Sequence, residues 1–108
     1  MNSAIFKALG NETRLRIVQT LLVKEHNVSD LTTISQKDQT TISRHLSTLV
    51  NVNIIKQKRL GRNIFYSIIN TDMKNWLNIV IEFKNEKNNE KILRSKIENF
   101  LINQEKNE

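Results

Sequence analysis

The stretch DQTTISRHLSTL, residues 38–49, predicts a short helix with two chemically different sides. At about 100° per residue, Ile42, Leu46 and Leu49 share one side, which would face a core. The remaining side carries small polar side chains and one arginine, where an ordinary surface helix usually carries Glu and Lys. These residues are Gln39, Thr40, Thr41, Ser43, Arg44 and Ser47.

Such side chains suit a recognition helix that reads double-stranded DNA. A helix that enters the major groove needs short hydrogen-bonding side chains near its N-terminus, because its backbone lies close to the base edges. Gln and Thr can pair with bases, Arg can bind guanine or a phosphate, and the helix N-terminus favours a phosphate. The alternative is an ordinary surface helix that is rich in Ser and Thr. The basic segment that follows favours the first interpretation.

The segment NIIKQKRLGRNIFYSII, residues 53–69, predicts a β-hairpin. Its strands would cover about 54–60 and 62–69, joined at Gly61, because Ile, Phe and Tyr alternate along it. The first strand and the tip carry four cations and no acid, and we expect these cations to contact DNA phosphates. They are Lys56, Lys58, Arg59 and Arg62.

Three more helices are predicted upstream of the recognition helix. The first covers residues 3–9, and the second runs for about twelve residues after a cap at Asn11. Ser29 is expected to cap a third, short helix whose Leu31 and Ile34 point inward. Helices closed by a hairpin follow the winged helix-turn-helix plan, so the fold class is mainly α with a small β-hairpin.

Residues 71–108 predict a C-terminal helix or helix pair with apolar stripes. The polar segment KNEKNNEK, residues 84–91, either continues the helix in solvent or breaks it, and a second stripe follows over 92–101. Both stripes suit a dimer interface, and also packing on the chain's own domain. We therefore predict a winged helix-turn-helix DNA-binding part at 1–70 and a dimerisation part at 71–108, within a single domain.

The composition limits the class of protein. A chain of 108 residues is about one domain. No run of eighteen apolar residues and no signal-peptide pattern occurs, so a cytoplasmic protein is expected without a membrane partner. The absence of proline and the two glycines favour helix, and without cysteine no thiolate can bind metal or sense oxidants.

The net charge of +6 is unevenly distributed. Residues 1–70 contain ten basic and four acidic residues, whereas residues 71–108 contain seven of each. The whole excess therefore lies on the predicted helix-turn-helix and wing. This asymmetry indicates a part that faces nucleic acid and a neutral part with another role.

Three segments resemble the ArsR/SmtB family of winged-helix repressors. They are FKALGNETRLRIVQTLL at 6–22, VSDL at 28–31 and TTISRHLSTLVNVNIIKQKRLGRNIFYSI at 40–68. The matching family patterns are an RLRIL helix, a V-DL start, an STVSRHL recognition helix and an R-G---YY-L wing. The resemblance implies a homodimeric DNA-binding repressor, with Gln39, Thr40, Ser43, Arg44 and Arg62 at the DNA. It also implies dimerisation through the N- and C-terminal helices, with Ile5, Phe6, Trp76, Leu77, Val80 and Phe83 at the interface.

The sequence departs from the family pattern at several places. Asn27 and Ser29 stand where metal-sensing members carry two cysteines, and the last helix has no His, so neither a metal site nor a cofactor is predicted. His26 is expected to be a solvated loop residue, and His45 to pack at the helix edge or contact a phosphate. The turn SQKD, residues 35–38, replaces the usual LGLS and lacks its glycine, which leaves the turn geometry open and places Lys37 near DNA or in solvent.

The prediction is a sequence-specific transcriptional regulator, a dimeric repressor of an inverted-repeat operator, without cysteine-type metal or redox sensing. The alternative is a winged-helix module that binds proteins and has no specific DNA target. The location of the excess charge favours the regulator. No enzyme is predicted, because the chain lacks a glycine-rich phosphate loop and its two His residues lack a carboxylate–hydroxyl arrangement. A small-molecule or protein effector is left open.

Overall fold

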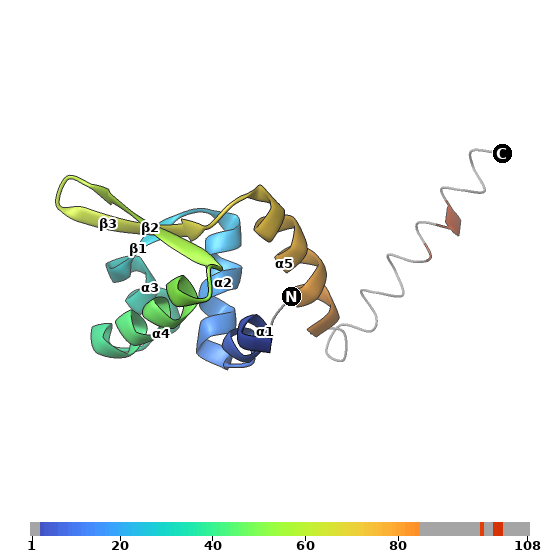
Figure 1. Cartoon of the computed structure of the whole chain (residues 1–108), viewed down its shortest axis with the longest axis horizontal. Helices are drawn as coiled ribbons and strands as arrows, with labels where there is room; N and C mark the ends of the chain where they lie inside the picture. Colours follow the sequence, from blue (N-terminus) through green and yellow to red (C-terminus); the bar gives the residue numbers. More distant parts are fainter. Residues whose placement is uncertain (1–2, 85–97, 99–100, 103–108) are drawn as a thin grey trace. The chain divides into compact units, whose positions relative to one another are not determined.

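The computed structural model describes residues 3–84 together with residues 98, 101 and 102 (Figure 1). The chain forms two compact units, residues 1–75 and 76–108. The described elements are α1 (Ser3–Leu9), α2 (Glu12–Val23), β1 (His26–Asn27), α3 (Val28–Ser35), α4 (Gln39–Asn51), β2 (Ile55–Leu60), β3 (Asn63–Ile68) and α5 (Thr71–Lys84). The order of helices and hairpin confirms the predicted winged helix-turn-helix plan, with α3 and α4 as the helix pair and β2–β3 as the wing.

Each long helix begins at a polar cap that accepts a backbone N–H. The side chains of Asn11 and Asp38 accept from the amides of Arg14 and Thr41 at 3.0 and 2.7 Å, so Asn11 caps α2 as predicted and Asp38 caps α4. The predicted cap of the third helix was wrong. Asn27 caps α3, because its backbone is extended and its side chain accepts the amide of Asp30 at 2.8 Å. Ser29 lies inside the first turn instead.

The sheet has three strands in the order β1–β3–β2, and both strand pairs are antiparallel. The hairpin strands lie within the predicted ranges, and Gly61 adopts a left-handed φ of 64° at the tip. The strand β1 was not predicted, because two residues are too short to show an alternating pattern. It pairs His26 with Tyr66 and Asn27 with Phe65, so β3 is the central strand.

The core of the first unit is built almost entirely from aliphatic side chains. Its completely buried members come from every layer of the unit, namely Leu9, Ile17, Val18, Leu31, Ile42, Leu46, Leu49 and Ile54. The prediction that Ile34 points inward was wrong, because Ile34 is 40% exposed. The inward positions of α3 are Leu31 and Ser35, which are four residues apart and so share one face of the helix.

The turn between α3 and α4 does without the glycine of the family pattern. Gln36 occupies the left-handed region at φ 55° and ψ 37°, where a glycine is most often found after a helix. The left-handed backbone therefore occurs at the position expected from the pattern, although a side chain is present there. Such a conformation costs a non-glycine residue about 1–2 kcal/mol.

The C-terminal helix α5 begins at Thr71, as predicted, and the side chain of Asn70 accepts the amide of Met73 at 2.8 Å. The predicted segment at 84–91 lies outside the described residues from position 85 onward. Of the predicted second stripe over 92–101, only residues 98 and 101 belong to the described part. Within that part, no helix is long and apolar enough to cross a membrane.

Candidate nucleic-acid interface

The helix α4 has an exposed polar face without acidic residues, and its opposite, apolar face is buried. Ile42, Leu46 and Leu49 are completely buried, as their spacing predicted. Five of the six predicted contact residues are exposed, namely Gln39, Thr40, Ser43, Arg44 and Ser47. The core contacts of the buried face therefore fix the direction in which the exposed face points.

Thr41 differs from the other predicted contact residues. It is half-buried, and its amide donates to the Asp38 carboxylate. Hydrogen bonds from the Thr41 hydroxyl and amide lower the pKa of Asp38, aided by the charges of Arg44 and Lys37. In this structure Thr41 is thus engaged in the helix cap, and its contact with DNA stays a prediction.

The wing carries its cations on both faces and at its tip. Lys56 is opposite Ser67 and Lys58 is opposite Phe65, so these lysines share one face of the hairpin. Arg59 points to the other face, and Arg62 follows the left-handed Gly61 in the turn. All four side chains are exposed, so the predicted cations are accessible, although they do not form a single row.

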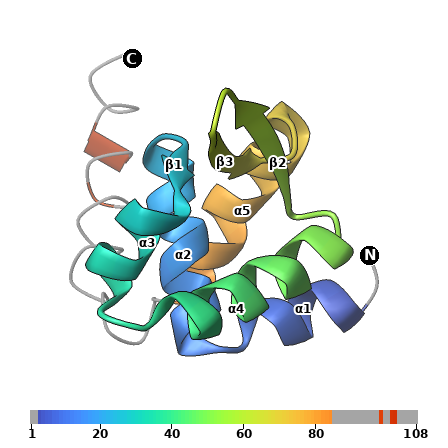
Figure 2. The ribbon, with the colours of Figure 1, turned by 90° about the vertical axis from the view of Figure 1, so that its left-hand side faces the viewer.

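The wing and the recognition helix belong to the same compact unit, in which α4 contacts β2. Figure 2 shows α3 and α4 in front of α2, with the hairpin above α4. A polar helix face and a basic hairpin are therefore presented from one unit. This combination can bind a polyanion in two ways, by base contacts from the helix and by phosphate contacts from the wing.

Arg14 connects α1 to α4. This role was not predicted, and the only signal for it is the position of Arg14 in the RLRIV segment. Its Nε donates to the Ala8 carbonyl at 2.7 Å, and its Nη1 lies 3.2 Å from Nδ1 of His45. His45 is half-buried, as expected for a residue at the helix edge. Burial lowers the pKa of His45, and the nearby charges of Arg14, Arg44 and Lys37 lower it further.

The environment of His26 contradicts its prediction as a solvated loop residue. Its side chain is only 11% exposed, and its Nδ1 lies 3.2 Å from Oδ2 of Asp30. The cause is the pairing of β1 with β3, which places His26 opposite Tyr66. Among residues 3–84, 98, 101 and 102, no group of three or more His, Cys, Asp or Glu side chains is arranged to hold a metal ion.

The predicted dimer residues have different environments. Phe6 is 47% exposed, whereas Ile5, Trp76 and Val80 are half-buried. Leu77 is completely buried, and the side chain of Phe83 lies outside the described residues. Ile79 was not predicted, although it is 59% exposed and belongs to the same helix. The assignment of these residues to an interface stays a prediction.

Comparisons with known proteins agree with this fold. Residues 11–57 match the model of the arsR family of bacterial regulatory proteins. The cadmium resistance transcriptional regulatory protein CadC of Listeria innocua is 31% identical over 85 residues, which cover 78% of this chain and 71% of that protein. The transcriptional repressor SdpR of Bacillus subtilis is 28% identical over 86 residues, which cover 80% of this chain and 96% of that protein.

A solved structure shows the same architecture. The homodimeric winged helix-turn-helix DNA-binding domain of a Mycobacterium bovis protein superposes with a TM-score of 0.73 at 27% identity, over 79% of each chain. Family pattern, relatives and fold thus agree on one kind of protein. This chain belongs to the ArsR family of bacterial regulatory proteins, which are DNA-binding transcriptional regulators with a winged helix-turn-helix.

Proposed function

We propose that this regulator binds an inverted-repeat operator as a homodimer and represses transcription. In this proposal each protomer inserts α4 into the major groove of one half-site, and the half-sites lie about one helical turn, roughly 34–36 Å, apart. Gln39, Thr40, Ser43, Arg44 and Ser47 contact base edges or nearby phosphates. The wing cations Lys56, Lys58, Arg59 and Arg62 contact the backbone beside them.

The observation that carries this proposal is the exposed face of α4. Five polar side chains without an acid among them lie on a helix whose other face is completely buried. The exposed wing cations support it, because phosphate contacts position a protein on DNA and base contacts specify the sequence. Thr41 is the weakest of the six candidates, because its hydroxyl and amide already bind Asp38.

Dimerisation through α1 and α5 is supported by exposed apolar side chains on each helix. Phe6 on α1 and Ile79 on α5 are 47% and 59% exposed, and apolar groups of this size gain free energy when a partner covers them. An inverted repeat requires a protein with two-fold symmetry, so a dimer also fits the expected operator. The M. bovis domain, which is homodimeric, has the same fold.

The family assignment also supports a role without catalysis and a place in the bacterial cytoplasm, where chromosomal DNA is found. We further propose that this regulator responds to a signal other than the oxidation or metallation of cysteine. The 108 residues contain no cysteine, and Asn27 is occupied as the cap of α3 where metal-sensing members have a ligand.

Binding to the DNA upstream of its own gene tests the proposal most directly. Fluorescence anisotropy with that DNA and with scrambled DNA of equal length should show a clear preference that weakens steeply with salt. Arg44→Ala should cost about 1–3 kcal/mol and relax the preference at particular bases. Lys24→Ala, which removes an exposed cation outside the proposed surface, is the matched control and should change little.

Variants of the wing should behave differently from those of α4. Lys58→Ala should weaken binding to both DNAs alike and lower the salt slope by about one unit. If Arg44→Ala changed neither affinity nor base preference, the assignment of α4 would be wrong. Binding that is insensitive both to salt and to DNA sequence would instead favour the alternative of a protein-binding module. A reporter gene behind the bound operator then decides between repression and activation.

A further inference from the structure

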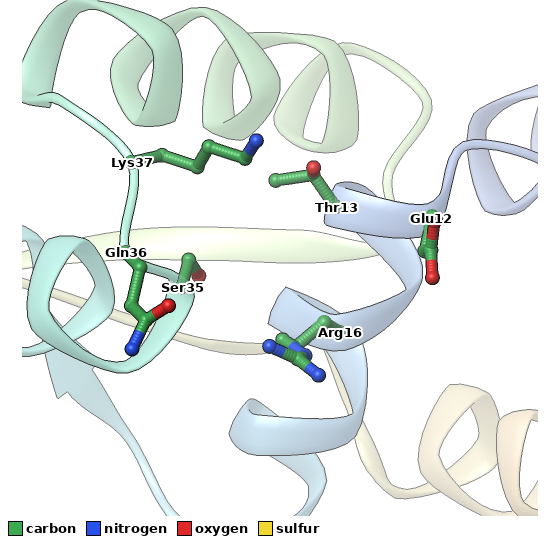
Figure 3. A pocket seen from close by; sticks show the side chains of 6 residues that line it. All are labelled: Glu12, Thr13, Arg16, Ser35, Gln36 and Lys37. Carbon is green, nitrogen blue, oxygen red and sulfur yellow. The ribbon is translucent and has the colours of Figure 1, made fainter.

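A surface pocket of about 280 Å³ lies beside the turn that precedes the recognition helix (Figure 3). Two segments of the first compact unit form it, the start of α2 and the turn from α3 to α4. Its lining residues are Glu12, Thr13, Arg16, Ser35, Gln36 and Lys37. The volume is close to the lower end of the range for small-molecule sites, about 300–1,000 Å³.

Ser35 is the one buried residue among those that line the pocket. Its side chain lies on the inward face of α3, at the position where the family pattern LGLS has leucine. Serine fills less space than leucine and leaves a hydroxyl where the pattern has only methyl groups. Ser35 is 7% exposed, and its hydroxyl has no hydrogen-bond partner in the described part of the chain. Since buried polar groups are normally paired, this hydroxyl is a donor available to a bound molecule.

The two cations of the pocket are also available. Between residues 3 and 84, neither Arg16 nor Lys37 forms a salt bridge, although Glu12 lines the same pocket. In the view of Figure 3, Lys37 extends toward Thr13 above the opening, Arg16 lies below it, and Glu12 lies at the far edge. Two unpaired cations and hydroxyl donors around one opening are the groups that bind an oxyanion.

We propose that this pocket binds a small anion through a phosphate or carboxylate group. Arg16 and Lys37 supply charge to the oxyanion, Thr13 and Ser35 supply hydroxyl donors, and Gln36 supplies an amide. The hydroxyl of Ser35 has no hydrogen-bond partner within the described part of the chain, so it is the buried donor that a bound anion would satisfy. The remaining volume holds the small body of the ligand.

The position of the pocket links it to the recognition helix. Gln36 and Lys37 are followed at once by Asp38, whose carboxylate caps α4. An anion bound by both α2 and this turn fixes the position of the left-handed turn relative to α2. It therefore restricts how far α4 can move relative to α2. This consequence rests on the proposed function, whereas binding of the anion does not. If the anion changes affinity for DNA, then DNA changes affinity for the anion by the same factor.

Inorganic phosphate is the probe for a first test. It would be titrated into the ¹⁵N-labelled full chain without DNA, at constant pH and with chloride added to hold the ionic strength. Saturable shifts of the amides of Thr13, Arg16, Ser35, Gln36 and Lys37 are expected. Shifts that rise without saturation, or that spread equally over the wing, would overturn the proposal.

Three variants separate a built site from general attraction to a basic protein. Arg16→Gln should weaken phosphate binding about tenfold, whereas the matched loss of charge in Lys24→Gln should leave it unchanged. Ser35→Ala should weaken it several-fold without lowering the melting temperature, because the hydroxyl has no partner to lose. Ser35→Leu should fill the pocket and abolish binding. Equal effects of Arg16→Gln and Lys24→Gln would overturn the proposal.

The source of the anion is decided by DNA binding in phosphate-free buffer. For a free metabolite, Arg16→Gln and Ser35→Ala leave affinity for DNA unchanged, and added phosphate alters the affinity of the wild type only. For a backbone phosphate of the operator, both variants weaken binding to specific and scrambled DNA alike, and phosphate competes. If no DNA is bound at all, the titration of the free chain still reports on the pocket, so failure of the proposed function is distinguishable.

Discussion

Replacing Arg14 by methionine should destabilise the protein far more than an ordinary surface substitution. The guanidinium of Arg14 binds the last turn of α1 through the carbonyl of Ala8 at 2.7 Å, and reaches His45 of α4 at 3.2 Å. A third bond, to the Lys7 carbonyl, is 3.4 Å long and exposed, so it contributes little. Methionine keeps the apolar stem but removes every donor.

The magnitude follows from the two shorter contacts. A hydrogen bond from a charged donor contributes about 1.5–3 kcal/mol, and a bond between an arginine and a neutral ring nitrogen at longer distance contributes about 1 kcal/mol. Partial exposure reduces the sum, so Arg14→Met should lower the free energy of unfolding by about 2–4 kcal/mol. For a domain of this size, the melting temperature should fall by roughly 10–20 °C. Because α1 has only seven residues, it depends on this bond and on the burial of Ala8 and Leu9 to stay helical.

Thermal unfolding followed by circular dichroism measures the effect, at one fixed protomer concentration because a dimer's melting temperature depends on concentration. The matched control is Arg16→Met on the same helix, which removes an exposed arginine without a salt bridge among residues 3–84 and should stay within about 0.5 kcal/mol of the wild type. If the two variants melted at the same temperature, Arg14 would not be tying α1 to α4.

Three further predictions test other parts of the structure. The pKa of His45 is lowered in the folded protein, so the unfolded chain binds a proton at His45 more readily. The contribution of His45 to the free energy of unfolding should be complete above about pH 6.5 and be lost below it. Denaturant unfolding between pH 8 and 5 should show this loss, and His45→Asn should reduce it. Gly61→Ala places a side chain at φ 64° in open space, so it should cost about 1 kcal/mol by strain alone, and an unchanged urea midpoint would contradict that reasoning. Leu46→Ala should remove a completely buried side chain and cost about 2–5 kcal/mol in urea unfolding, whereas Val23→Ala, at a position that is 80% exposed, should cost little.

The fold was predictable because most of its elements carry strong local patterns. The apolar spacing of Ile42, Leu46 and Leu49 and the cap at Asp38 determine α4 almost alone. The hairpin follows from alternation around Gly61. The strand β1 was not predictable, because its two residues form a strand only through pairing with β3, which is a long-range contact. The environment of His26 depends on that pairing, so its prediction failed with it.

The exposure of the candidate site residues was predictable because it follows from helix geometry. Their hydrogen-bond partners were less predictable. The exposed face of α4 follows from the position of its buried face. The sequence shows neither the engagement of Thr41 with Asp38 nor the contact of Arg14 with Ala8 and His45, because each depends on which neighbours lie within hydrogen-bond distance. The same holds for Ser35, whose burial is evident only once α3 is placed.

Two arginines of helix α2 lie on opposite sides of the helix and contact different parts of the protein. Arg14 and Arg16 are two residues apart and therefore point about 200° away from each other around the helix. Arg14 joins α1 to His45 of α4, whereas Arg16 lines the pocket at the turn before α4. Changes at α1, the predicted dimer helix, and the binding of an anion in the pocket would thus both act on α4 through α2. Since the buried face of α4 is packed into the core, we expect α4 to shift as one body, so that either signal changes all of its DNA contacts together.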